Sequence, residues 1–425
     1  MKEKMKLTKL EKSWILYDIG NSAFILLVST LLPIYFNALA SGAGISESDY
    51  LAYWGYAGSV ATILVAILGP ICGALADQKY KKPLFLGSLA LGAIGCAALG
   101  VAWGWLSFLV IFVIARVGYN SANVFYDSML TEVTTEERMD NVSTMGYALG
   151  YIGSVIPFAV CLVLVLLHDT FGMSQVSALI ISFILTAVWW IACSVPLAKR
   201  YQQTAYHEKK GKAVGESFKQ LGRTFKEAKK HKHIFVYLIA FFFFIDGVYT
   251  IIDMATAYGT ALGLDTTGLL LALLVTQIVA FPFAILFGRL ATKYDTGLLI
   301  KICIISYSVI IAFAVFLVAQ WQFWLLAVLV GMFQGGIQAL SRSYLARIIP
   351  GEHSAAYFGL MDICGKGASF LGLLLVGAVN QALTGVTLNV FGIELQNANI
   401  AVSTLLVLMT IGFLLFCMAD KMNRK

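Results

Sequence analysis

Polar and charged side chains recur at helical spacing inside four otherwise apolar stretches of the chain. In chain order they are Asp18, Asn21 and Ser22; Arg116, Asn120, Asn123 and Asp127; Asp246, Tyr249, Thr250 and Asp253; and Gln334, Gln338, Ser341 and Arg342. Residues three or four positions apart share one face of a helix. A charge at the centre of a bilayer costs roughly 2.5–3.5 kcal/mol. The stripes therefore predict either a polar lining for a solute or ion pathway, or structural contacts between membrane helices.

A second arrangement of charges lies near the C-terminal end. Asp362 and Lys366 are four residues apart, so they share a helix face. Neither charge is affordable alone in lipid, and we expect them to pair with each other or with Asp246. The pair is either a fixed ion pair between helices or a contact that opens and closes with protonation or substrate binding.

The composition shows what must position these residues. Of the 425 residues, 59% are hydrophobic and 12% are charged, against about 25% charged in a soluble globular chain. The apolar runs are continuous rather than alternating, which excludes a β-barrel. All seven cysteines lie inside apolar runs without ligand spacing, so neither disulfides nor a metal site is predicted. We expect an all-α membrane protein and no soluble enzyme.

Twelve runs are long enough to cross a membrane, since a spanning helix needs about 20 apolar residues. Their approximate limits are 14–40, 51–76, 84–102, 106–128, 144–167, 175–197, 234–258, 268–290, 298–318, 321–341, 355–379 and 398–419. Of the 30 lysines and arginines, 28 fall at the termini or in alternate gaps, with Arg289 and Lys301 at run ends counted in the gap between them; Arg116 and Lys366 lie well inside runs. This partition predicts that both termini are cytoplasmic. It also assigns the net charge of +7 to loops that face anionic lipid, and not to nucleic-acid binding.

The chain repeats itself at about half its length. A shift of 215 aligns Gly73-x-Leu-Ala with Gly288-x-Leu-Ala, and Leu130-x-x-Val-x-x-x-Glu with Leu345-x-x-Ile-x-x-x-Glu. We therefore predict an N-terminal six-helix half over 1–197, a cytoplasmic linker over 198–233 and a C-terminal six-helix half over 234–425. Apolar residues 214, 218, 221 and 225 suggest a helix on the membrane surface within the linker. A solvated linker is the equal alternative.

The residues Gly73-Ala-Leu-Ala-Asp77-Gln-Lys-Tyr80-Lys81-Lys82 resemble the loop signature of the major facilitator superfamily, in which a glycine precedes two basic residues. Here Tyr80 replaces that glycine and Lys81 the first arginine. The resemblance implies twelve transmembrane helices in two pseudo-symmetric six-helix bundles, with a cavity lined by the first, fourth, seventh and tenth helices. It also implies a cytoplasmic gate at Gly73, Asp77, Lys81 and Lys82.

A narrower resemblance rests on Trp14-Ile-Leu-Tyr-Asp-Ile-Gly-Asn-Ser-Ala-Phe24 and Gly146-Tyr-Ala-Leu-Gly-Tyr-Ile-Gly153. Both segments are similar to the vacuole-effluxer branch of the superfamily, whose fungal members are associated with exporting amino acids. The compact loops suggest a bacterial relative. The resemblance implies an efflux protein for amino acids.

The sequence thus predicts a secondary transporter in the plasma membrane that moves a small polar solute, first an amino acid, by alternating access. Protons are a candidate second partner, membrane lipid surrounds the chain, and a monomer is expected. No cofactor is predicted, and no ATP site, because no Gly-rich loop ends in Gly-Lys-Ser or Gly-Lys-Thr. The alternatives are a receptor or scaffold with the transporter fold and, less favoured, an intramembrane enzyme.

Overall fold

The computed structural model describes residues 6–45, 47–206, 231–262, 264–383, 385–390 and 392–424. Inside the helices, the description excludes the side chains of residues 47–52, 55, 66, 70, 71, 74, 256, 257, 260, 261, 266, 267, 270 and 366–370. The surface helix suggested around residues 214–225 falls outside the described residues.

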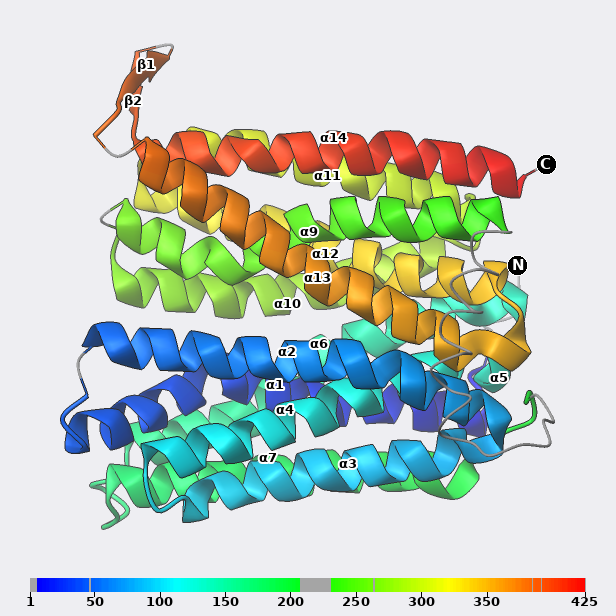
Figure 1. The fold of residues 1–425 in the computed structure, drawn as a ribbon, viewed down its shortest axis with the longest axis horizontal. Coiled ribbons are helices and arrows are strands. Elements are labelled where there is room, and N and C mark those ends of the chain that lie inside the picture. Colours follow the sequence, from blue (N-terminus) through cyan, green and yellow to red (C-terminus); the bar gives the residue numbers. More distant parts are fainter. Residues whose placement is uncertain are drawn as a thin grey trace. The chain divides into compact units, whose positions relative to one another are not determined.

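Each of the twelve predicted runs is a helix that begins at or before its expected first residue. They are α1 (Lys9–Gly42), α2 (Glu47–Leu75), α3 (Lys81–Ala98), α4 (Trp105–Ser128), α6 (Met139–Leu166), α7 (Gln175–Arg200), α9 (Lys232–Ala261), α10 (Thr266–Leu290), α11 (Thr296–Val315), α12 (Gln320–Ile348), α13 (Ser354–Ala382) and α14 (Asn397–Asn423) (Figure 1). A π-helical turn, Ala76–Tyr80, joins α2 to α3, and the short α5 (Leu130–Val133) follows α4.

Most of these helices are suited to a bilayer by length and composition. Within the described ranges, ten are long and apolar enough to cross a membrane, while α2 and α13 contribute the shorter apolar stretches Tyr56–Gly69 and Leu371–Ala382. Both α2 and α13 have 29 residues, about 44 Å at 1.5 Å per residue, which exceeds the ~30 Å hydrocarbon core. The chain is an all-α membrane protein in its architecture, as predicted.

Polar caps define several helix starts. Thr8 and Glu11 form a reciprocal capping box at the start of α1, with the Thr8 N–H 2.7 Å from a Glu11 carboxylate oxygen. Asp265 and Asp295 accept hydrogen bonds from the backbone N–H groups of Gly268 and Leu298 at the starts of α10 and α11. These side chains satisfy N–H groups that have no partner inside the helix.

The chain folds into two compact units. Unit 1 comprises Met1–Thr135, Leu149–Leu221 and Pro350–Gly359, and unit 2 comprises Glu136–Ala148, Gly222–Ile349 and Leu360–Lys425. The first residues of α6 thus belong to unit 2, and the first residues of α13 belong to unit 1. The predicted division at the linker 198–233 stays a prediction.

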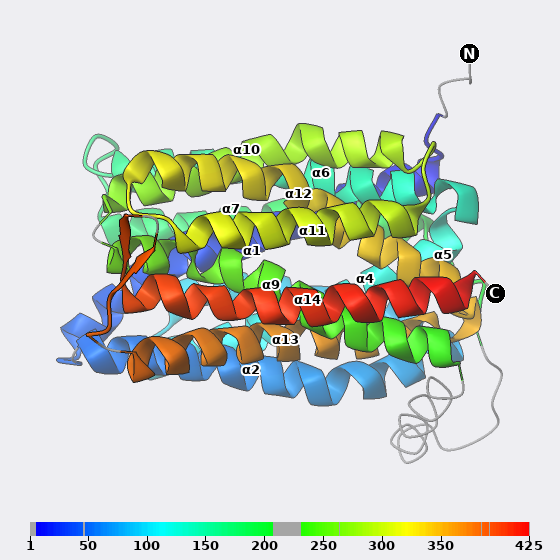
Figure 2. The same cartoon turned by 90° about the horizontal axis from the view of Figure 1, so that it is seen from above.

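Small residues allow close helix contacts within each unit. In unit 1, α3 packs on α4 and α1 packs on α7, and a Cβ at Gly118 would lie 2.3 Å from the Gly92 nitrogen. In unit 2, α14 lies beside α9 and α11 (Figures 1 and 2), and a Cβ at Gly412 would lie 2.6 Å from the Phe244 nitrogen. Such contacts between backbones are typical of packing in lipid, where apolar burial drives helices together only weakly.

One element departs from the helical prediction. The segment between α13 and α14 forms an antiparallel hairpin of β1 (Leu388–Val390) and β2 (Ile393–Leu395), with Leu388 opposite Leu395. Gly392 in the turn has φ +79°, and its N–H donates to the Asn389 side chain. Glycine adopts this left-handed conformation without steric cost. The hairpin projects beyond the ends of α13 and α14 (Figure 1).

Candidate functional site

The first and second predicted stripes come together inside unit 1. The Asn123 side-chain oxygen of α4 accepts hydrogen bonds from the Tyr17 hydroxyl at 3.2 Å and the Asn21 amide at 2.9 Å, both from α1. Asn21 is buried, as is Asn120 one turn before Asn123. Asn123 thus joins two polar side chains that precede it by 106 and 102 residues.

Charged residues of both signs lie near Tyr119, one turn before Asn123 on α4. Asp18 of α1 is buried, and Arg116, Asp18 and Asp127 all act electrostatically on the Tyr119 hydroxyl of α4. We call Tyr17, Asp18, Asn21, Arg116 and Asn123 the α1–α4 polar group. It offers a cation, an anion and amides within one compact unit, which matches the needs of a small solute carrying both charges.

The third stripe centres on Asp246 of α9. Its side chain is fully buried, and one carboxylate oxygen accepts from the Thr250 hydroxyl at 3.1 Å and from the Gly372 N–H of α13 at 2.9 Å. Tyr249 is half-buried, and Asp253 is exposed. The stripe therefore has a buried part, in which Asp246 contacts the backbone of α13, and an exposed end at Asp253.

The fourth stripe, on α12, is associated with a small cavity. Gln334 is buried and lines a cavity of about 40 Å³ together with Gln277 and Thr276 of α10. Its side-chain oxygen accepts no hydrogen bond from the described part of the chain. Gln338, one turn further, is half-buried.

The predicted pairing of Asp362 with Lys366 stays a prediction. Asp362 is half-buried on α13, and the Lys366 side chain lies outside the description. The hydrogen bonds that the structure gives to Asp246 come from Thr250 and Gly372.

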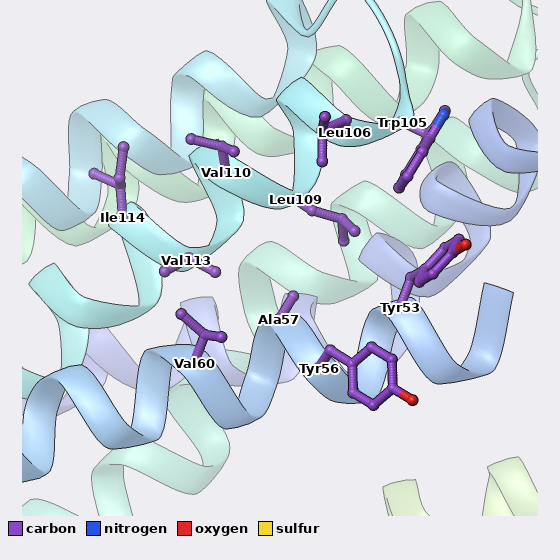
Figure 3. A pocket seen from close by; sticks show the side chains of 10 residues that line it. All are labelled: Tyr53, Tyr56, Ala57, Val60, Trp105, Leu106, Leu109, Val110, Val113 and Ile114. Carbon is purple, nitrogen blue, oxygen red and sulfur yellow. The ribbon is translucent and has the colours of Figure 1, made fainter. Parts of the chain in front are cut away.

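A larger cavity, of about 430 Å³, has a different character. It lies between α2 and α4, and its lining is apolar apart from the rings of Tyr53, Tyr56 and Trp105 (Figure 3). Tyr53 stacks on Trp105 with ring centroids 5.0 Å apart. None of the predicted site residues lines it, and its lining residues include no charged side chain.

The predicted gate residues meet the start of α13 within unit 1. The Asp77 carboxylate accepts the backbone N–H groups of Ala355 and Ala356, each at 3.0 Å. An anion is favourable at the positive end of a helix. A Cβ at Gly73 would lie 2.7 Å from the Ala355 carbonyl oxygen, so only glycine allows this approach.

The two lysines of the same motif have separate partners. The Lys81 ammonium is fully buried, 2.5 Å from Glu132 and 3.0 Å from the Ser354 hydroxyl. Lys82 donates to the Tyr201 carbonyl at 2.8 Å. We call Asp77, Lys81, Glu132 and Ser354 the first helix-end cluster. Sequence reasoning missed Glu132 and Ser354.

A second helix-end cluster, Asp140, Thr296, Ser343 and Arg347, lies within unit 2. Asp140, near the start of α6, accepts from Arg347 at 2.7 Å, from Thr296 at 2.7 Å and from Ser343 at 2.5 Å. Arg347 also donates to the Thr296 hydroxyl. Beside this cluster, Arg342 donates to Ser143 and covers the Tyr147 ring.

The 215-residue repeat relates the two clusters and reverses their charges. Lys81 corresponds to Thr296, and Glu132 corresponds to Arg347. Gly288, the counterpart of Gly73, likewise has no room for a Cβ, which would lie 2.2 Å from the Thr144 hydroxyl oxygen of α6. The second copy has Thr292 in place of Asp77, and Asp140 on the docked helix supplies the carboxylate instead. Both clusters thus hold the first turn of a helix from the other half of the sequence.

The turn between α2 and α3 contains an unfavourable backbone conformation. Lys79 has φ +78°, one residue before Tyr80, which replaces the glycine of the family signature. An L-residue in the left-handed region costs roughly 1–2 kcal/mol. The Lys79 ammonium also lies 5.0 Å from the Tyr206 ring centre.

We expect Lys79→Gly to be more stable than Lys79→Ala by about 1 kcal/mol. Both substitutions remove the Tyr206 contact, but only glycine removes the steric cost of the positive φ at position 79. Thermal unfolding of the two purified variants in detergent measures the difference. Equal midpoints would show that the turn rearranges without cost.

Comparisons with known proteins agree with this architecture. The family model described as "Vacuole effluxer Atg22 like" matches residues 131–425. The MFS-type transporter YxiO of Bacillus subtilis is 39% identical over 416 residues, covering 96% of this chain and 94% of YxiO. Autophagy-related protein 22-1 of Aspergillus niger is 26% identical over 56% of this chain and 42% of its own length.

Solved structures show the same fold. A bacterial homologue of the iron transporter ferroportin has a TM-score of 0.73 at 12% identity, covering 97% of this chain and 98% of its own. The major facilitator transporter FucP has a TM-score of 0.70 at 15% identity, with 97% of both chains covered. The relatives are transporters and not enzymes, and the chain belongs to the Atg22-like vacuole effluxer family within the major facilitator superfamily.

Proposed function

We propose that this transporter carries a small polar solute, with amino acids as the first candidate class. The α1–α4 polar group supports the proposal most directly. Arg116 suits a carboxylate, Asp18 suits an ammonium group, and Asn123 already gathers Tyr17 and Asn21 at one point. Charges held inside membrane helices are costly and are typical of substrate or ion pathways. The family description as an effluxer supports export as the direction.

Alternating access assigns a role to the two helix-end clusters. In this mechanism the solute site opens to one side of the membrane at a time. The clusters hold the first turns of α13 and α6 through backbone and charged contacts. Both are thus candidates for contacts that break and re-form during the cycle, and Lys82 supports the first through Tyr201.

The proposal is tested by counterflow in proteoliposomes with a panel of radiolabelled amino acids. We expect at least one amino acid to exchange, and Asn123→Leu to reduce exchange because it removes the acceptor of Tyr17 and Asn21. Asp169→Asn is the matched control, since this carboxylate is 95% exposed outside the helices. Folded protein that exchanges no amino acid would contradict the proposed substrate class and favour another solute or a receptor role.

The topology gives a separate prediction. The charge partition predicts that Lys2, Lys212 and Arg424 face the cytoplasm and that Ser46, Asp265 and Glu394 face outside. Single-cysteine variants at these positions, without the native cysteines, are treated with an impermeant thiol reagent in intact cells. We expect labelling only at positions 46, 265 and 394. Labelling at 212 but not at 265 would show that the predicted orientation is wrong.

A further inference from the structure

The two carboxylate oxygens of Asp246 have different surroundings. The residue is 0% exposed in the middle of α9. Oδ1 accepts the Thr250 hydroxyl and the Gly372 N–H. Oδ2 is also buried and accepts no hydrogen bond from the described residues. Among the described residues, one oxygen is therefore engaged and the other is left to a ligand.

Size and charge identify that ligand. Burying an ionised carboxylate with an unsatisfied oxygen has a large desolvation cost. A substrate group does not reach Oδ2 while the side chain is fully buried. A proton needs no such space, and it removes the charge that makes burial costly. The ligand that fits Oδ2 is a proton.

The neighbouring helices present few charges. α9 packs on α10, α11, α12 and α14, and the residues next to Gly247 are Met409 of α14 and Ile311 of α11. Acidic and basic residues on these helices and on α13 are Arg289, Lys301, Arg342, Arg347, Asp362, Lys366, Asp420 and Lys421, and those of α9 itself are Lys232, His233 and Asp253. Lys301 contacts Asp420, and Arg342 and Arg347 contact the start of α6.

The engaged oxygen connects the charge state to α13. The Gly372 N–H, inside α13, donates to Asp246. A Cβ at Gly372 would lie 2.1 Å from the Thr250 oxygen and 2.3 Å from Oδ1. Only glycine permits this contact. Hydrogen bonds to an ionised acceptor are roughly twice as strong as neutral ones, so protonation weakens the attachment of α13.

We propose that Asp246 is the proton-binding site that couples transport to a proton gradient, with Thr250 and Gly372 as its positioning residues. The proposal rests on the proposed transport function. Oδ2 takes a proton from one side of the membrane to give the neutral acid, which loosens the bond to Gly372. Return of the proton to the other side restores the carboxylate and the bond.

The first test needs no substrate. Infrared difference spectra of the purified protein between acid and alkaline pH record the loss of protonated carboxyl absorption. We expect one buried carboxyl band to titrate in the parent, to vanish in Asp246→Asn and to shift in frequency in Thr250→Val. Asp169→Asn should keep the band. A spectrum unchanged by Asp246→Asn would overturn the proposal. Gly372→Ala would crowd the site, so Thr250→Val is the variant used to perturb the engaged carboxylate oxygen.

The second test compares two transport modes, using whichever amino acid shows counterflow in the parent. Asp246→Asn should lose pH-driven accumulation by a larger factor than counterflow. If both modes fall equally, or accumulation persists, the inference is wrong while the transport function stands. If the infrared band depends on Asp246 but no amino acid is exchanged, the proposed substrate class fails and the proton site stands.

Discussion

Replacing Glu132 with methionine should destabilise the protein more than replacing Lys81 with methionine, although the two form one ion pair. Their side chains are 2% and 0% exposed. Without Glu132, the Lys81 ammonium keeps one hydrogen bond within the described residues, to the Ser354 hydroxyl, and the electrostatic interaction with Asp77. Without Lys81, the Glu132 carboxylate keeps the Tyr201 hydroxyl at 2.9 Å and two backbone N–H groups at 2.6 and 3.0 Å. Breaking one side of a buried pair costs about 3–5 kcal/mol. The donors that remain around Glu132 reduce this cost when Lys81 is replaced.

Thermal unfolding in detergent, monitored by size-exclusion chromatography, gives the order of stability. We expect the parent to be most stable, then Lys81→Met, then Glu132→Met, with the double variant above Glu132→Met. Lys82→Met is the matched control, because the half-buried Lys82 makes a single bond to a carbonyl and should lose less. Additive losses in the double variant would show that Lys81 and Glu132 do not stabilise each other.

The helices and the polar face of α4 were predictable because both signals are local. Continuous apolar runs identify helices, and the spacing of Arg116, Asn120, Asn123 and Asp127 places them on one face whatever their neighbours are. The motif also located Gly73 and Asp77, whose contacts with the start of α13 the structure shows. The functions of these residues stay proposals.

The helix-end clusters were predictable only in part: the motif located Asp77 and Lys81, but their partners are distant in sequence. Lys81 and Glu132 are 51 residues apart, and Arg347 and Asp140 are 207 apart. In the sequence, Arg347 indicates only which side of the membrane a loop faces, and the acidic Glu132 and Asp140 do not indicate even that. Gly372 gives no signal, because its contribution is a backbone N–H. The hairpin was missed for a related reason: its three-residue strands are too short for a periodic pattern.

Replacing Asp140 with asparagine should release the start of α6 from α11 and α12. Asp140 accepts from Arg347, Thr296 and Ser343, and it is buried. Hydrogen bonds to charged groups contribute about 1.5–3 kcal/mol, which is roughly a 10- to 150-fold change in an equilibrium. Thr144 reports the release, because it is 0% exposed and lies against Gly288. In a background without native cysteines, Thr144→Cys should react with a thiol reagent faster by that factor once Asp140→Asn is added.

Exchanging the charges provides the decisive control. Asp140→Arg combined with Arg347→Asp should return the labelling rate toward that of the parent, because the Thr296 and Ser343 hydroxyls donate or accept as required. The first cluster already works with the opposite polarity, since Ser354 accepts from Lys81 there. Asp140→Arg alone should label fastest, because it places two cations together. If Asp140→Asn reacts at the parent rate, the charge of Asp140 does not hold the start of α6, and the contact of Arg342 with Ser143 and Tyr147 is then sufficient.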